Sequence, residues 1–113
     1  MNIDNINEKL YKENKYAEEA LKENEYIKIK GVGNSMTPIL KNKQTVLVQR
    51  INKETQLEKN DIIFCKVGPY YYLHKIISIN KDRYQIGNNH GHVNGWIGRE
   101  NIFAKVIRIL KDN

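Results

Sequence analysis

Three places in the sequence concentrate side chains that could do chemistry. The first is segment 33–38, GNSMTP, whose glycine and proline predict a tight and rigid turn. Such a turn can expose the hydroxyl of Ser35 while the backbone N–H groups of Asn34 and Ser35 point at one position. That arrangement is what an oxyanion hole requires. An ordinary, chemically inert turn serine is the alternative.

The second place is His74, within the apolar segment YYYLHKIISI at 70–79. A strand here puts Tyr72, His74, Ile76 and Ser78 on one face. A strand holds the imidazole rigidly, and its ordinary pKa lies near neutrality, so His74 suits the role of general base. A hydrogen-bonded, half-buried structural histidine is the alternative.

The third place is segment 87–98, which carries His90 and His92 among several asparagines. Two histidines one residue apart can ligate a metal, but the segment offers no Cys or Asp beside them. A site would need His74 as a third ligand. We expect a solvated loop over 87–95, and no metal or cofactor.

The elements that must position these residues follow from the apolar pattern. Apolar residues recur at spacings of three and four over 3–23, which predicts an amphipathic helix. The remainder shows alternating or β-branched segments and no alternation of strands with helices, which favours a mainly β fold. The expected strands are 26–30, 45–51, 61–67, 70–79, 83–86 and 102–110. We therefore expect an N-terminal helix in 1–24, which docks or forms a homodimer, and a β domain over 25–113.

Length and composition limit the class of protein. The chain has 113 residues, enough for one domain with one core. It contains no apolar stretch of about 18 residues, so we expect neither a membrane anchor nor a secretory signal. Cys65 is the single cysteine and cannot form an internal disulfide. These features predict a soluble, cytoplasmic protein.

The charge is unevenly distributed. Residues 1–25 carry seven acidic residues and four lysines, a net charge of −3, and the remaining 15 basic and 6 acidic residues give +9. A positive domain attracts polyanions, so nucleic acid is one conceivable partner. The lysines are scattered singly, however, without interleaved aromatic residues that would stack on bases. Nucleic acid is therefore not the partner we expect.

Taken together, five segments resemble the serine peptidase superfamily of signal peptidases and LexA-type self-cleaving repressors. They are GNSMTPIL at 33–40, NDIIFCK at 60–66, YLHKIISI at 72–79, IGNNHGHVNGW at 86–96 and the closing IFAKVIRI. The resemblance implies coiled antiparallel β-sheets around a hydrophobic peptide groove, and recognition of small side chains before the scissile bond. It also implies that Ser35 is the nucleophile and His74 the base, the Ser–His type of this superfamily, with Lys75 where an arginine is usual.

The sequence departs from that family at the acidic positions. The family's Gly-Asp-Asn motif stands here as Gly-Asn-Asn, with Asn88 in the acidic place, and the residue that orients the base falls near Asn94. Either asparagine could orient His74 through its carbonyl oxygen. A carboxylate from elsewhere is the alternative, and the candidates are Asp61, Asp82 and Glu100. Because Gly33 has no hydroxyl, the oxyanion hole would depend on the N–H groups of Asn34 and Ser35.

Two functions remain on these grounds. The chain lacks the Ala-Gly or Cys-Gly pair at which repressors of this type cleave themselves, and residues 1–25 are too short for a helix-turn-helix domain. We therefore expect a serine peptidase, a hydrolase that cleaves a precursor or leader peptide in trans. The alternative is a catalytically impaired module of the same fold that binds peptide or protein, or less plausibly nucleic acid, without cleavage.

Overall fold

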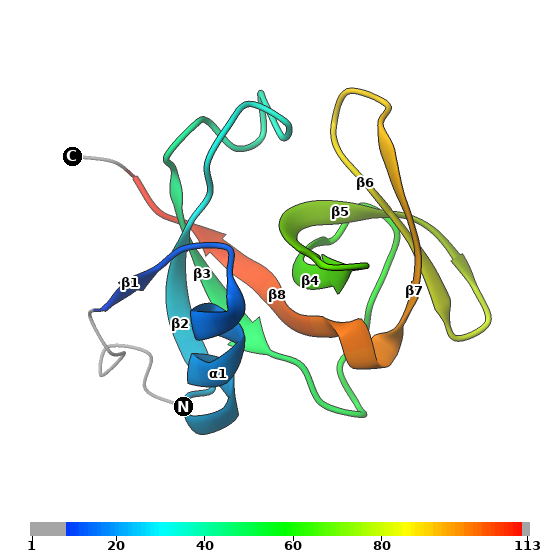
Figure 1. Cartoon of the computed structure of the whole chain (residues 1–113), viewed down its shortest axis with the longest axis horizontal. Helices are drawn as coiled ribbons and strands as arrows, with labels where there is room; N and C mark the ends of the chain where they lie inside the picture. Colours follow the sequence, from blue (N-terminus) through cyan, green and yellow to red (C-terminus); the bar gives the residue numbers. More distant parts are fainter. Residues whose placement is uncertain (1–8, 112–113) are drawn as a thin grey trace.

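The computed structural model describes residues 9–111, which form one eight-stranded sheet and one α-helix (Figure 1). The expected mainly β fold is confirmed. In chain order the elements are β1 (Leu10–Tyr11), α1 (Lys15–Glu23), β2 (Tyr26–Lys30), β3 (Thr45–Arg50), β4 (Ile62–Val67), β5 (Tyr70–Asn80), β6 (Arg83–Gly87), β7 (Val93–Gly98), the short 3-10 helix η2 (Arg99–Asn101) and β8 (Ile102–Ile109).

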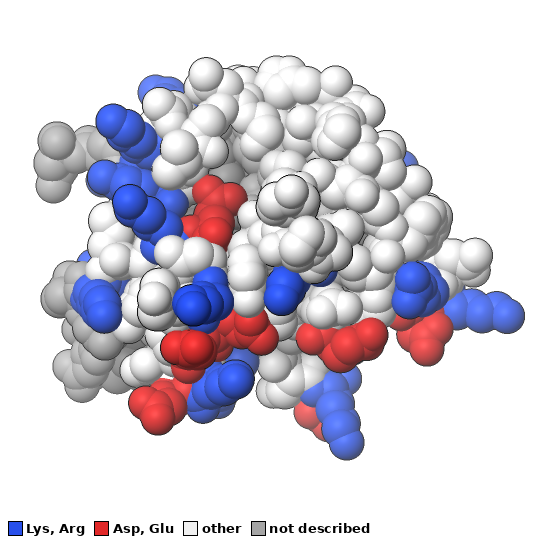
Figure 2. Space-filling view, viewed as in Figure 1, with Lys and Arg blue, Asp and Glu red and all other residues white. Residues whose placement is uncertain are grey.

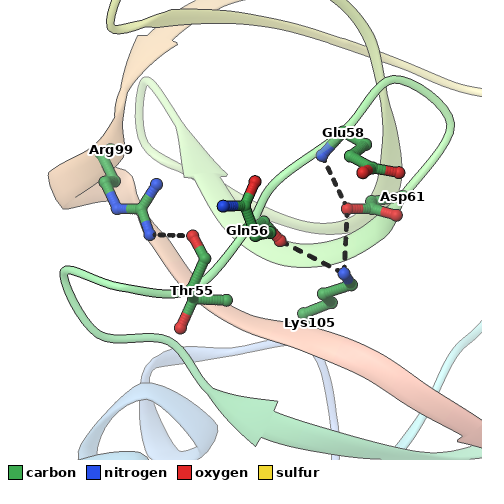
Figure 3. A network of polar contacts seen from close by, with 6 residues as sticks. All are labelled: Thr55, Gln56, Glu58, Asp61, Arg99 and Lys105. Carbon is green, nitrogen blue, oxygen red and sulfur yellow. Dashed lines mark hydrogen bonds and ion pairs between the residues drawn. The ribbon is translucent and has the colours of Figure 1, made fainter.

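The sheet order is β1-β2-β3-β8-β4-β5-β6-β7, and every neighbouring pair is antiparallel except β1 and β2. Because β8 lies between β3 and β4, segment 51–61 must carry the chain past β8. Two side chains from the end of the chain hold this segment (Figure 3). Arg99 donates to the carbonyl of Thr55 at 2.6 Å, and Lys105 donates to the carbonyl of Gln56 at 3.2 Å.

The sheet curls around two groups of buried apolar side chains. The strand β4 contributes to both, because successive side chains point to opposite faces. Phe64 belongs to the first group, whereas Ile63 and Cys65 belong to the second. The first group is Ala17, Leu21, Ile27, Ile29, Met36, Leu40, Val46, Val48, Phe64, Leu73 and Ala104, and the second is Ile63, Cys65, Ile76, Tyr84, Ile86, Ile97 and Ile102.

The helix is shorter than the pattern predicts. Residues 3–8 of the expected helix lie outside the described residues, Leu10 and Tyr11 form a strand, and α1 begins only at Lys15. Its N-cap is Asn14, whose side chain accepts from the backbone N–H of Tyr16 at 2.9 Å. An N-cap residue has extended backbone geometry, so the chain cannot be helical through Asn14. The helix packs on its own domain through the buried Ala17 and Leu21.

The nine-residue loop expected over 87–95 is also wrong at both ends, because Gly87 belongs to β6 and residues 93–95 belong to β7. Strand β7 begins at Val93 and pairs with β6, with Gly87 opposite Val93 and Ile86 opposite Gly95. Gly95 has φ of 146°, which a side chain would disfavour, so the glycine that suggested a loop instead permits the strand to continue. Asn94 therefore lies on a strand.

Charged side chains avoid one part of the surface. Figure 2 shows lysine, arginine and acidic residues along the lower part and the left of the view, whereas the upper right, over β5, β6 and β7, is almost uncharged. The loop between β2 and β3, which carries Ser35, and the hairpin between β6 and β7 rise on either side of β5 in the same view (Figure 1).

Candidate active site

His74 lies near the middle of β5 and is only 6% exposed. Its ring stacks on Tyr72, with 4.7 Å between the ring centroids and 25° between the planes. Burial lowers the pKa of His74 below its ordinary 6.5; the hydrogen bond to Asn94 acts in the opposite direction, and the charge of His92 adds to the lowering. The imidazole is therefore held rigidly, and its burial favours the neutral form.

Ser35 and Asn94 contact the two nitrogens of this ring. The Ser35 Oγ lies 3.1 Å from His74 Nε2, and the Asn94 Oδ1 lies 2.7 Å from His74 Nδ1. The amide oxygen can only accept, so Nδ1 carries the hydrogen and Nε2 presents a lone pair. The Ser35 hydroxyl consequently donates to Nε2. The three side chains form one directed line of hydrogen bonds from Ser35 to Asn94.

Asn88, the other expected orienting residue, does not contact His74. Its Oδ1 accepts from the backbone N–H groups of His90 and His92 at 2.8 and 3.0 Å. Asn88 therefore closes the β6–β7 loop. His90 in turn donates from Nε2 to the carbonyl of Asn34 at 3.0 Å.

The acidic alternatives also lie away from the ring. Asp61 pairs with Lys105 at 3.2 Å and accepts from the N–H of Glu58 (Figure 3). Asp82 is exposed in the turn between β5 and β6, and Glu100 is exposed in η2. Within residues 9–111, no group of three His, Cys, Asp or Glu side chains is placed to hold a metal ion.

Asn89 joins the Ser35 loop to the strand that carries His74. Its backbone N–H donates to the Ser35 carbonyl at 2.8 Å, and its side-chain N–H donates to the Thr37 carbonyl at 2.9 Å. Its Oδ1 accepts from Lys75 Nζ at 2.9 Å. Sequence reasoning treated Asn89 only as part of an altered motif and assigned it no contact.

The peptide planes around Ser35 are fixed through their carbonyls. The Asn34 carbonyl accepts from the N–H of Thr37 at 3.2 Å and from its hydroxyl at 2.9 Å, besides the bond from His90. In a trans peptide the N–H points opposite to the C=O. The N–H of Ser35 therefore points away from His90. The Ser35 carbonyl is fixed by Asn89, which sets the direction of the next N–H in the same way.

Glu13 also reaches this site, although it was not among the candidate residues expected from the sequence. Its Oε1 accepts from the N–H of Val32 at 2.8 Å, and its Oε2 accepts from the N–H of Leu73 at 3.0 Å. Burial raises the pKa of this carboxyl above 4.5, against the lowering effect of the two hydrogen bonds. Glu13, Ser35 and Leu73 line a cavity of about 20 Å³. The one signal in the sequence is that Glu13 and Asn14 are polar where the apolar spacing of the helix expected over 3–23 would place an apolar residue.

Comparison with known families agrees with the geometry. A family model described as Peptidase S24-like matches residues 1–107, nearly the whole chain. No curated protein matches the chain. Among residues 9–111, no helix combines the length and the apolar character needed to cross a membrane.

Proposed function

The chain belongs to the Peptidase S24-like family, and from that premise we propose that it is a serine endopeptidase that cleaves a precursor or leader peptide in trans. The observation that carries the proposal is the line of hydrogen bonds from Ser35 through His74 to Asn94, with separations of 3.1 and 2.7 Å. Both separations lie within or near the range over which a base takes a proton from its nucleophile.

The proposed reaction begins with His74. Its Nε2 takes the proton from Ser35 Oγ as the oxygen attacks the substrate carbonyl carbon, which gives a tetrahedral intermediate. The backbone N–H groups of Asn34 and Ser35 stabilise the negative oxygen. The imidazolium then returns its proton to the leaving amine, the C–N bond breaks, and water, deprotonated by His74, hydrolyses the acyl-serine.

Asn94 selects the productive tautomer of His74 without supplying a charge. In a serine protease where asparagine replaces the triad aspartate, kcat falls by about 10⁴ because the histidine adopts the wrong tautomer. Here the amide oxygen faces Nδ1, so the tautomer is correct and only the stabilisation of the imidazolium is missing. We therefore expect a slow enzyme with an intact proton path.

Exposed apolar side chains close to the reacting residues favour a peptide as the substrate. Val32 and Ile39 flank Ser35 in the chain and are 64% and 45% exposed, and Val93 precedes Asn94 and is 47% exposed. Isolated exposed apolar residues are common, but three beside one catalytic pair suit the side chains of an extended peptide. Figure 2 shows few charged side chains over β5 to β7, so this part of the surface carries little charge that would oppose a neutral peptide. The cytoplasmic location expected from the sequence stays a prediction.

The test is cleavage of a panel of peptides with small residues before the scissile bond. Wild type should cleave at least one, and Ser35→Ala and His74→Ala should abolish that cleavage. The matched control is Ser78→Ala, which removes the other serine of the chain. Cleavage that persists in both site variants would contradict the proposal.

A binding module is the second candidate, favoured by the asparagine at position 94 where a carboxylate would be expected in an efficient enzyme. In that case peptides would bind to wild type and to Ser35→Ala with equal affinity, and neither protein would cleave them. Affinity for nucleic acid that falls steeply with added salt would instead point to the positive surface.

A further inference from the structure

We propose that Glu13 is a positioning residue that holds the segment bearing Ser35 against the strand bearing His74. This inference rests on the proposed function, and it concerns how the two reacting groups are kept together. The Glu13 carboxylate accepts one hydrogen bond from each side: from Val32, three residues before Ser35, and from Leu73, the residue before His74.

No strand pairing joins the segment bearing Ser35 directly to the part of β5 around His74. In the sheet order, β3, β8 and β4 lie between β2, which leads to the Ser35 loop, and β5, which carries His74. Strand β6 covers the outer edge of β5 only from Lys75 onward. The outward N–H of Leu73 therefore lies beyond the end of β6, and it donates its hydrogen bond to the Glu13 carboxylate.

Glu13 is well suited to this bridge because its own backbone is anchored on both sides. Before it, Leu10 and Tyr11 pair with β2, and after it Asn14 caps α1. Hydrogen bonds from N–H groups to a carboxylate are stronger than those between neutral groups, and two of them at 2.8 and 3.0 Å fix both segments relative to one acceptor.

The partial burial of this carboxylate supports a functional reason for its presence. Removing a carboxylate from water is unfavourable unless its hydrogen bonds compensate, and burial raises the pKa of Glu13 despite the two bonds it accepts. A neutral glutamine would be less costly to bury. Its amide nitrogen, however, would face an N–H group and could not accept, so only the carboxylate serves both segments.

The experiment must distinguish this positioning role from the opposite one, in which Glu13 competes with substrate. The N–H groups of Val32 and Leu73 are also the kind of edge donors that an extended peptide uses when it adds to a sheet. If a substrate carbonyl takes one of them, Glu13 would compete with substrate, and its removal would lower KM and raise activity. If Glu13 is a positioning residue, its removal should instead lower activity and change KM little.

The experiment compares wild type with Glu13→Ala and Glu13→Gln, with Glu19→Ala as the control that removes an exposed carboxylate from α1. We expect kcat, and the rate at which an organophosphonate fluoride modifies Ser35, to fall about 10- to 100-fold in Glu13→Ala, as for a misplacement of about 1 Å. Glu13→Gln, which keeps one acceptor, should fall less. KM should change by less than about threefold. Melting temperatures identify any variant that fails to fold.

A second measurement decides the inference even if the wild type proves inactive. The imidazole ¹⁵N shifts of His74 report its tautomer and its bond from Ser35. They should change in Glu13→Ala and stay unchanged in Glu19→Ala. Unreactive wild type would overturn the proposed function alone. Unchanged ¹⁵N shifts in Glu13→Ala, or activity equal to or above that of wild type, would overturn the role of Glu13.

Discussion

Replacement of Asn94 by aspartate tests how the His74 ring is supported. The substitution keeps an acceptor 2.7 Å from His74 Nδ1 and adds a negative charge beside it. A negative neighbour favours the protonated imidazole, so the pKa of His74, which burial now lowers, should rise. The same charge should stabilise the imidazolium that forms as Ser35 attacks.

The expected size of the effect follows from the geometry. Two unit charges about 4 Å apart interact by about 4 kcal/mol at an effective dielectric constant of about 20. One pKa unit corresponds to about 1.4 kcal/mol, so the upper limit is about three units. Asn94 is only half-buried, and solvent screens part of this interaction, so we expect a rise of about one to three units. At a pH above the new pKa, reaction of Ser35 should accelerate by about 10- to 1,000-fold.

The assay is the rate of modification of Ser35 by an organophosphonate fluoride across pH, with the His74 pKa measured by NMR. Asn88→Asp is the matched control, because it adds the same charge to the same hairpin at a side chain that bonds to the loop and not to His74. A His74 pKa that shifts no further in Asn94→Asp than in Asn88→Asp, or a slower reaction at high pH, would refute the assigned contact.

Three further outcomes follow from the site. Because burial lowers the pKa of His74, the unfolded chain binds a proton more readily, so the free energy of unfolding should fall as the pH drops below 6.5. Urea denaturation should show this fall in wild type and not in His74→Gln, and an equal fall in both would assign it to other groups. Gly33→Ala should destabilise the fold by about 1–2 kcal/mol, because φ is 96° there while a Cβ would meet nothing within 4 Å; an unchanged urea midpoint would contradict this. Asn89→Ala should slow the modification of Ser35 about tenfold, because the side-chain bond to the Thr37 carbonyl is lost, and full reactivity would show that the loop is held without it.

Local patterns were sufficient to predict most of the strands. The alternation in 26–30 and the β-branched residues of 45–51 and 61–67 match β2, β3 and β4 within one residue. These segments bury one or both faces, so the pattern of their apolar side chains indicates a strand directly. The identification of the family, which required five segments in order, is confirmed by the family match.

Both failures involve long-range contacts that override local preference. Strand β7 was missed because asparagine and glycine at 94 and 95 resemble a loop until the register with β6 is known. The helix was extended too far because the N-cap at Asn14 was missed, and because Glu13 bonds to Val32 and Leu73, residues 19 and 60 positions away. No local pattern records such contacts.

The residues of the candidate site also differ in how far the sequence indicated them. A turn and a strand marked Ser35 and His74 as candidates, and the resemblance assigned their roles and pointed to Asn94; the structure brings the three side chains within hydrogen-bond distance. The contacts of Asn89 and Glu13 depend on how loops meet in space, and their residue types gave no indication of them. The acidic residues proposed as substitutes failed for a related reason, since Asp61 is already engaged by Lys105.

The most direct measurement of the central claim is the mass of the intact protein after reaction with an organophosphonate fluoride, followed by mapping of the modified peptide. The account predicts one adduct, on Ser35, that forms in wild type and Ser78→Ala and is absent from Ser35→Ala and strongly slowed in His74→Ala. An absence of any adduct, or equal rates in wild type and His74→Ala, would contradict it.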